Sequence, residues 1–484
     1  MAKLIQRLIE LRREKVLAER LLRALMWRLS VICMRLSHKC LRLSVFCMQS
    51  GILRLSLFLA KLHCRLAKPN YRRLKQAIIK SEEVGIYRYQ SVESWIDSQA
   101  KTIPVYPERM VKLHPVWQVG FKNDRAELHT KNHHVTLPPV SLYTLKHVEV
   151  IGGSEMIFTR DGILLYDELA LGDVTRYGTK AYSIVPYVGT APYFPAACKE
   201  NVLCRYHRHE QSTEVLCAIS LLKDYSQNYF HWLLECLPRA IMALRHPDWD
   251  DAPLLIDVDM PSQHIESLRL LSPERKHIPV PKGMRLPVQM LYFPSVLSFT
   301  HDYYGTSPRT EDFLIAPEAV ALLRESFLQN ATSSAIKQNQ QFIYVARSSV
   351  YRSILNDHEV INALVELGFS IVYPENLSFA EQIALFSNAK IIVGPTGAGM
   401  TNMVFAGADC KIVVLAAVTH GANFYIFSQI AQYLNQQIVY FGGEPIDPSD
   451  LHSHYHINVH ALQMMIEKLC DSRKIVTGMS ASNR

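Results

Sequence analysis

The feature that most constrains the fold is a regular alternation of short apolar runs and amphipathic segments after residue 340. The run "QFIYVA" at 341–346 is rich in β-branched and aromatic residues and predicts a strand. Residues 356–367 then have the spacing of a helix, with Asn356 or Asp357 as the N-cap and Gly368 just beyond the end. Strands that alternate with helices in this way predict an α/β fold with a parallel, doubly wound sheet.

The same alternation continues through a second helix and three more strands. The run "FSIVY" at 369–373 predicts a strand, and Ser378 with Glu381 fits the S-x-x-E pattern of a capping box, where a helix begins. The runs "KIIV" at 390–393 and "KIVVLA" at 411–416 predict two further strands. Between these strands lies a glycine-rich stretch, and a short helix is predicted to begin near Met400.

The stretch "GPTGAGMTN", residues 394–402, is a candidate anion site. It leaves the carboxyl end of a predicted strand and enters a helix, where unpaired N–H groups and the helix dipole favour negative charge. The Walker pattern needs a lysine that is absent here, and the dinucleotide pattern needs glycine where Asn402 stands. A tight turn without a ligand remains the alternative.

Two arginines follow the first predicted strand of this sheet. Arg347 and Arg352 lie in "ARSSVYR", at the sheet edge where ligands of such folds bind. The guanidinium fork suits phosphate oxygens. The alternative is a pair of solvated arginines in a surface loop.

A third candidate segment, "NYFHWLLECLPRA" at 228–240, precedes this sheet. It predicts a helix that ends or kinks at Pro238, with His231 and Glu235 four residues apart on one face. A carboxylate beside an imidazole stabilises the protonated ring, which suits a general base. The alternatives are a solvated pair of side chains and a core histidine.

Charge divides the 484 residues into an arm and a body. Residues 1–80 contain 19 Lys and Arg against 3 Glu, so the arm carries +16, while the whole chain carries +8. A polyanionic partner is expected for the arm, and its few aromatic residues disfavour nucleic acid. The remaining length predicts two domains, at 81–315 and 316–484, the second ending in a helix that crosses back to the first.

The arm also has a heptad pattern. Arg28, Arg35 and Arg42 recur every seven residues on an apolar background, which predicts an amphipathic helix lying on an anionic membrane surface. Residues 43–60 are the best candidate for a membrane span, but Arg54 interrupts them. Packing of the arm on the body or on a partner subunit is the other alternative.

Metal and disulfide chemistry have little support in the sequence. Asp257 and Asp259 form a D-x-D, which we interpret as a strand-ending turn, and His452, His454 and His456 lack a nearby cysteine partner. The ten cysteines include no CxxC pair, which is typical of reduced thiols in a cytosolic protein. We therefore expect no metal and no resident cofactor.

Taken together, "NYFHWLLECLPR", "ARSSVYR" and "ENLSFAEQIALFSNAKIIVGPTGAGMTN" resemble, in this order, the family 61 glycosyltransferases, including the bacterial capsular polysaccharide biosynthesis type. The resemblance covers residues 225–416. It implies a GT-B-like architecture, with two Rossmann-like domains around a cleft, an inverting mechanism and a nucleotide-sugar donor as co-substrate. In this family histidine often precedes the G-A-G, where this chain has Thr396.

The resemblance also assigns roles to residues of this chain. It marks His231 and Glu235 as catalytic. It places the following residues at the donor: Arg239, Arg347, Arg352, Glu381, Gln382, Gly397, Ala398, Gly399 and Asn402. Thr396 departs from the family pattern and is added to the donor site because its hydroxyl can bond a phosphate.

The predicted function is metal-independent transfer of a sugar to a hydroxyl of a glycan or glycolipid in surface polysaccharide biosynthesis. The enzyme is expected in the cytoplasm, peripheral on the inner face of the membrane. Two alternatives stay open: a non-catalytic membrane-associated component of polysaccharide assembly, and a Rossmann-type oxidoreductase.

Overall fold

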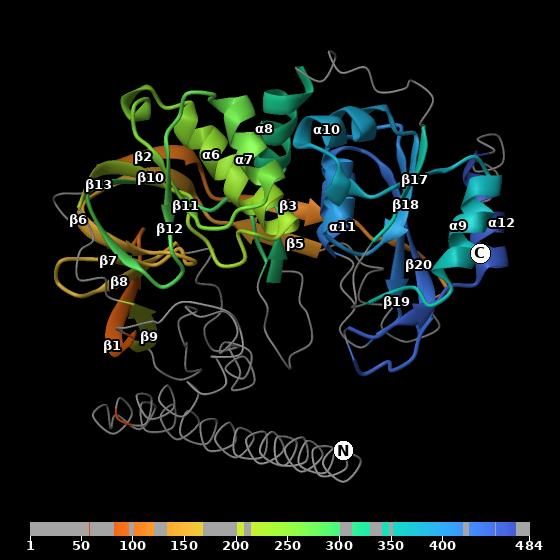
Figure 1. The fold of residues 1–484 in the computed structure, drawn as a ribbon, viewed down its shortest axis with the longest axis horizontal. Helices are drawn as coiled ribbons and strands as arrows, with labels where there is room; N and C mark the ends of the chain where they lie inside the picture. Colours follow the sequence, from red (N-terminus) through yellow and green to blue (C-terminus); the bar gives the residue numbers. More distant parts are fainter. Residues whose placement is uncertain are drawn as a thin grey trace, which may run out of the picture.

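The chain forms a mixed α/β structure, as predicted (Figure 1). The computed structural model describes Phe58 and residues 82–95, 101–120, 133–167, 201–207, 214–300, 312–329, 341–347, 352–419, 425–450 and 452–470. The predicted arm, residues 1–80, lies outside the described residues apart from Phe58. None of the described helices is both long enough and apolar enough to cross a membrane.

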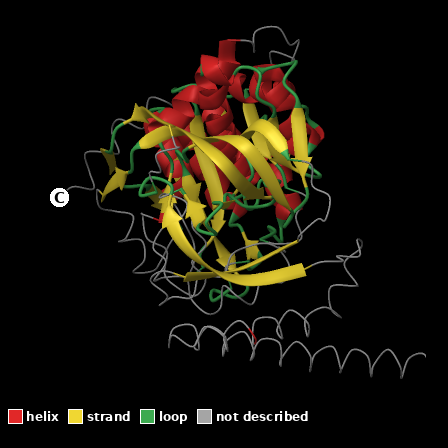
Figure 2. Cartoon of the chain, turned by 90° about the vertical axis from the view of Figure 1, so that its left-hand side faces the viewer, coloured by secondary structure: helices red, strands yellow, loops and turns green. Residues whose placement is uncertain are grey.

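The first half of the described chain builds a mixed sheet in the order β12-β11-β10-β13-β6-β7-β8-β1-β9, with β2 beside β6. Strands β12, β11, β10 and β13 run parallel, and β13 then pairs antiparallel with β6 over almost its whole length. Figure 2 shows these strands in front of the helices. The strands are β1 (Glu82–Ser91), β2 (Lys101–Tyr106), β6 (Val140–Ile151), β7 (Ile157–Phe158), β8 (Leu164–Tyr166), β9 (Asn201–His207), β10 (Val215–Ser220), β11 (Leu254–Asp257), β12 (His277–Val280) and β13 (Arg285–Pro294).

The helices that follow β10 and β11 lie between this sheet and the second one (Figure 1). They share one apolar core with the second half of the chain, in which the rings of Phe327, Phe379 and Phe405 meet edge to face. This core joins the two halves through closely packed side chains. The helices are α5 (Tyr229–His231), the π-helical turn η4 (Trp232–Cys236), α6 (Leu237–Leu244), η5 (Pro247–Trp249), α7 (Ser262–Leu271) and α8 (Pro317–Phe327).

Of the two outcomes predicted at Pro238, an end or a kink of the helix, the end was wrong. The helix continues to Leu244, because a π-helical turn precedes Pro238 and places it at the start of α6, where its missing N–H costs little. The wider turn carries Glu235 on its inner side, fully buried. π-Turns inside helices are frequent at functional sites.

The second half forms a sheet in the order β17-β16-β18-β19-β20-β21, and the first five of these strands are parallel. Strand β4, from the predicted first domain, adds to β20. The strands are β4 (Trp117–Val119), β16 (Phe342–Val345), β17 (Ser370–Val372), β18 (Ile391–Pro395), β19 (Lys411–Ala417), β20 (Gln437–Pro445) and β21 (Tyr455–His456). Two short pairs complete the strands of the described residues: β3 (Arg109–Leu113) with β5 (His133–Leu137), and β14 (Phe299–Thr300) with β15 (Phe313–Leu314).

Helices cover both faces of the second sheet, as the doubly wound prediction requires. The alternating side chains of β16 show this directly: Ile343 packs with α10 and α11, and Tyr344 with α9 and α12. The capping box of Ser378 and Glu381 is confirmed. The predicted terminal helix forms, and it packs against α9 of this sheet. The helices are α9 (Asp357–Glu366), η8 (Pro374–Asn376), α10 (Phe379–Asn388), the 3-10 helix η9 (Ala398–Phe405), α11 (Tyr425–Tyr433) and α12 (Val459–Cys470).

The strand order places a crevice at one point of this sheet. After β16 the chain moves outward to β17, then returns to the other side of β16 as β18. At such a switch point the two connections diverge and leave a space beyond the carboxyl ends of the strands, where ligands of open α/β sheets bind. The segments that follow β16 and β18 are those of Arg347 and the glycine loop.

Candidate functional site

A cavity of about 440 Å³ occupies this switch point. Its volume lies in the range that holds small-molecule ligands. One wall comes from the ends of β16 and β18, and the facing wall comes from α5 and the start of α7. It is lined by Gln227, Tyr229, Pro261, Gln263, His264, Val345, Ala346, Arg347, Pro374, Glu375, Gln382, Pro395, Gly397, Ala398, Gly399 and Met400.

Arg347 is the cation on the wall formed by the second sheet, which also carries the carboxylate of Glu375. Its Nη1 donates to the carbonyl oxygen of Thr396 at 3.0 Å, which lays the guanidinium along the glycine loop. Burial and the nearby charge of Arg352 lower the pKa of Arg347. Among the described residues no carboxylate forms an ion pair with Arg347. A cation held without a counter-ion beside a second cation is a site for an anion.

The glycines of the loop serve two different purposes. A Cβ on Gly394 would lie 2.7 Å from Sδ of Met400 and 2.9 Å from Cβ of Val345, so this glycine permits close packing. A Cβ on Gly397 would meet Nη1 of Arg347 at 3.4 Å. The second glycine therefore leaves room for the arginine and for whatever the arginine binds.

A chain of buried hydrogen bonds joins the two walls. The hydroxyl of Tyr229 donates to Oδ1 of Asn402 at 2.6 Å, and Nδ2 of Asn402 donates to Oε1 of Gln382 at 2.7 Å. Asn402 is fully buried and does not line the cavity, whereas Gln382 does. Asn402 thus ties the segment of His231 to the glycine loop.

Replacing Tyr229 by phenylalanine should destabilise the protein by about 1–3 kcal/mol, because Oδ1 of Asn402 would stay buried without a donor. Thermal unfolding of the full-length protein measures the effect. The control is Tyr373→Phe, which removes the hydroxyl of an exposed tyrosine and should leave the midpoint unchanged. Equal midpoints for both variants would contradict the linking role of Tyr229.

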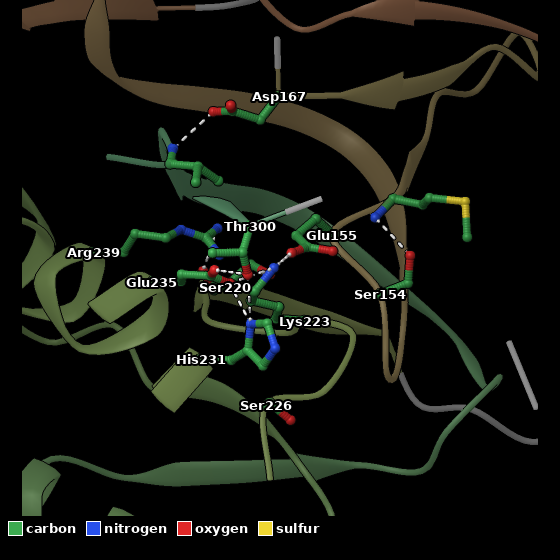
Figure 3. A network of polar contacts seen from close by, with 12 residues as sticks. Ser154, Glu155, Asp167, Ser220, Lys223, Ser226, His231, Glu235, Arg239 and Thr300 are labelled. Carbon is green, nitrogen blue, oxygen red and sulfur yellow. Dashed lines mark hydrogen bonds and ion pairs between the residues drawn. The ribbon is translucent and has the colours of Figure 1, made fainter. Parts of the chain in front are cut away.

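His231 and Glu235 meet as predicted from their spacing, but beside the cavity and not in its lining (Figure 3). Nδ1 of His231 lies 2.9 Å from Oε2 of Glu235, and the hydroxyl of Thr300 donates to the other carboxylate oxygen at 2.9 Å. A carboxylate at Nδ1 favours the tautomer with hydrogen on that nitrogen and leaves Nε2 as an acceptor. The ring of Tyr225 stacks on His231, with centroids 5.7 Å apart.

Behind this pair lies a buried ion cluster, which we define as Glu155, Lys223 and Glu235. Nζ of Lys223 is 2.6 Å from Glu155 and 3.0 Å from Glu235, and all three side chains are at most 6% exposed. Burial acts to raise the pKa of Glu235, but the charges of Lys223 and His231 outweigh it and lower that pKa to about 2. Glu235 is therefore a carboxylate at any physiological pH.

Three residues around the site have a left-handed backbone that is costly for a side chain other than glycine. Tyr225 follows β10, Asp259 follows β11 and Arg352 follows β16, with φ between 53° and 60°. All three lie beyond the carboxyl ends of parallel strands. Strained residues of this kind persist at ligand and active sites, where the surrounding structure fixes them.

The other residues that the resemblance marked have structural contacts. Arg239 is fully buried and donates from Nε to the carbonyl oxygen of Pro294 and from Nη2 to that of Ser220. Glu381 caps α10, and hydrogen bonds from Ser378 lower its pKa. Neither side chain lines the cavity. Arg352 donates its backbone N–H to His452, and its charge acts on Arg347.

His264 lines the cavity with a buried ring. Only 2% of the residue is exposed. The ring packs on Trp232 at a centroid distance of 5.0 Å. Burial lowers the pKa of His264 to about 4, so the folded protein keeps this ring neutral.

This histidine should make the fold sensitive to mild acid. Between the ordinary histidine pKa and about 4, the unfolded chain binds a proton that the folded chain refuses, so stability falls with pH by about 2 kcal/mol from pH 7 to pH 5. His264→Phe keeps the aromatic contact and should remove this part of the slope. Unfolding midpoints of the unchanged protein and of His264→Phe are measured at pH 7 and pH 5. An equal fall in the midpoint of both proteins would contradict the assignment of the acid sensitivity to His264.

The structure supports the turn interpretation of the D-x-D. Asp257 ends β11 fully buried and accepts hydrogen bonds from the backbone N–H of Gly153 and Lys223 and from the hydroxyl of Ser226. Across the described ranges no three His, Cys, Asp or Glu side chains gather in a way that could hold a metal ion, His452, His454 and His456 included.

Comparison with known proteins identifies a family match. Residues 229–413 match the family model described as Glycosyltransferase 61. The resemblance to family 61 is confirmed. The matched segment begins at Tyr229 and includes His231, Glu235, Arg347 and the whole glycine loop. A stretch of 66 residues is 38% identical to the EGF domain-specific O-linked N-acetylglucosamine transferase of Gallus gallus, over 13% of this chain and 12% of that protein.

Sequence reasoning missed several residues around the family 61 motif. Lys223 and Tyr229 precede His231 closely in the chain, and this proximity could have marked them as candidate site residues. Glu155 contacts Lys223 and Thr300 contacts Glu235, and both come from distant segments that the antiparallel pairing of β13 with β6 brings together. No local pattern marks them.

Proposed function

We propose that this protein is an inverting, metal-independent glycosyltransferase that moves a sugar from a nucleotide-sugar donor to a hydroxyl of a glycan or glycolipid acceptor. The observation that carries the proposal is Arg347: a cation without a carboxylate partner among the described residues, laid on a glycine loop at the switch point of a doubly wound sheet. A diphosphate matches this arrangement in charge and in hydrogen bonding.

The donor would occupy the cavity, with its diphosphate at Arg347 and Gly397–Gly399 and Arg352 adding charge nearby. As the bond from the anomeric carbon to the diphosphate oxygen breaks, the electron pair stays on that oxygen. The guanidinium groups stabilise the growing negative charge, which is a role that a divalent metal has in other transferases. This is the basis for proposing metal independence, and a GT-B-like donor domain formed by the second sheet.

His231 would act as the general base. Its helix, α5, carries Tyr229, which lines the cavity, so the backbone of His231 lies within one turn of that wall. Nε2 takes the proton of the acceptor hydroxyl while its oxygen attacks the anomeric carbon from the face opposite the leaving group. Glu235 stabilises the imidazolium through Nδ1, and the configuration at the anomeric carbon is inverted.

The basic arm supports a proposal about where in the cell the enzyme acts. With a charge of +16 in 80 residues, it would hold the enzyme on the anionic cytoplasmic face of a membrane, where glycolipid acceptors of surface polysaccharides are found. Sedimentation with vesicles tests this. The full-length protein should bind vesicles that contain anionic lipid, and binding that is equal to neutral vesicles would contradict it.

A nucleotide panel tests the function itself. Thermal shifts of the purified full-length protein are measured with UDP, GDP, CMP and NAD, because a ligand that binds only the folded state raises the midpoint. A shift with one nucleoside phosphate supports the transferase. A shift with NAD alone favours an oxidoreductase, and no shift favours a non-catalytic component of polysaccharide assembly.

A further inference from the structure

The ion cluster of Glu155, Lys223 and Glu235 has no evident purpose in stability. Its three side chains are almost completely removed from water, and Nζ of Lys223 also lies 3.7 Å from the ring centroid of Phe299. Desolvation of three charges opposes folding, and apolar side chains of similar volume often serve stability equally well. The charges therefore call for an explanation in the chemistry beside them.

The charge balance of the cluster depends on His231. Within the three residues of the cluster, two carboxylates and one ammonium group leave one negative charge, which Glu235 presents to Nδ1 of His231 at 2.9 Å. The buried guanidinium of Arg239, one helical turn beyond Glu235, is a further cation in this network. A neutral imidazole leaves the excess charge in place. An imidazolium cancels it, so the proton that His231 accepts completes a buried pair of positive and negative charges.

We propose that Lys223 and Glu155 are positioning residues that adjust how strongly Glu235 supports a proton on His231. Lys223 shares the carboxylate of Glu235 with the imidazole, so its positive charge reduces the electrostatic stabilisation that Glu235 gives to a proton on His231. Glu155 pairs with Lys223, offsets that positive charge and restores the stabilisation. The inference rests on the proposed function, in which His231 is the general base.

Other titratable groups face this cluster from the packed elements. Burial and the charge of Glu155 raise the pKa of Asp224, which follows Lys223, to about 7. Among the described residues, the neighbours with a charge or an ionisable group are Asp224 and Tyr225 after β10, Cys236 on η4, Arg239 on α6, Asp257 at the end of β11 and Lys282 before β13. Glu155 and Lys223 differ from these in their direct contact with each other and, through Lys223, with Glu235.

Two substitutions should shift the proton affinity of His231 in opposite directions. Glu155→Gln keeps an amide oxygen for Nζ but leaves Lys223 to pair with Glu235, so the imidazolium loses support. Lys223→Met removes the competing cation, so the imidazolium gains support. We expect the midpoint of the His231 ring titration to move down in the first variant and up in the second, by about one pH unit each.

The experiment is an NMR titration of the full-length protein labelled at histidine, with the His231 signal identified by its loss in His231→Asn. Opposite shifts support the proposal, and an unmoved midpoint in well-folded Glu155→Gln overturns it. If Lys223→Met does not fold, the double variant Lys223→Met with Glu155→Gln replaces it, and an upward shift relative to Glu155→Gln alone is required.

Activity separates this inference from the proposed function. In the transferase assay the acid limb of the pH profile of kcat/KM should follow the same shifts, whereas a purely structural role would lower activity equally at every pH. If His231→Asn retains turnover, the general base is misassigned and the proposed function fails at that point. If His231→Asn is inactive and neither cluster variant moves the limb, only the role of Lys223 and Glu155 is wrong.

Discussion

His231→Asn is expected to lower sugar transfer by about a thousandfold, the range in which general-base catalysis contributes. Asparagine can still donate a hydrogen bond to Oε2 of Glu235, which lies 2.9 Å from Nδ1 of His231. What it removes is the acceptor at Nε2. The local structure should therefore persist, but no group remains to accept the proton of the acceptor hydroxyl.

The measurement is kcat and KM for transfer, with the donor affinity taken from thermal shifts. Donor binding should stay within a factor of two or three of the unchanged protein. The matched control is His358→Asn on the exposed face of α9, which should leave both constants unchanged. A turnover within tenfold of the control would show that His231 is not the base.

Arg347→Ala should lower kcat by about a hundredfold or more, because in the proposed mechanism the guanidinium acts on charge that develops as the nucleoside diphosphate departs. A loss of ground-state binding alone would raise KM and leave kcat unchanged. Arg347→Lys should recover only part of the rate, since a single ammonium cannot reproduce both the bond to Thr396 and a fork on phosphate.

Arg245→Ala is the control for this experiment, because Arg245 forms an exposed ion pair with Glu325 away from the cavity. It should change neither constant. An Arg347→Ala enzyme with an unchanged kcat would remove the diphosphate from this part of the cavity, and with it the observation on which the proposed function rests.

The second sheet could be predicted in detail because its signals are local. The strands at Phe342 and Ile391 are short apolar runs, the helix after Ser378 has a complete capping box, and Gly368 ends its helix with a φ of 85°. The order of these elements along the chain leaves few topologies once right-handed crossovers are required. The glycine loop and Arg347 could therefore be placed at one edge from the sequence alone.

The first sheet could not be predicted in the same way. Its central ladder pairs Arg285 with Ile151 and Pro294 with Leu142, and nothing in either segment names its partner. The π-turn before Pro238 was also missed, because a proline in a helical pattern predicts an end or a kink, and the wider turn that accommodates it has no sequence signature. The same limit hid Glu155, whose contact with Lys223 depends on how the whole sheet folds.

The contacts of Asn402 show how the site in the structure differs from the site predicted from the sequence. The residue was assigned to the donor from its place in the glycine loop, and the structure places its side chain behind that loop, bonded to Tyr229 and Gln382. The physical reason is the 3-10 helix that begins at Ala398, which turns Asn402 inward, where a buried amide needs partners. Position in a motif predicts which loop a residue belongs to but not the direction of its side chain.

The most direct test of the central claim is donor consumption by the purified full-length protein, measured as release of nucleoside diphosphate from a panel of nucleotide sugars. The account predicts that one donor is consumed, that an acceptor hydroxyl accelerates the release, and that Arg347→Ala abolishes it. Release from no member of the panel, or equal release by Arg347→Ala, would contradict it.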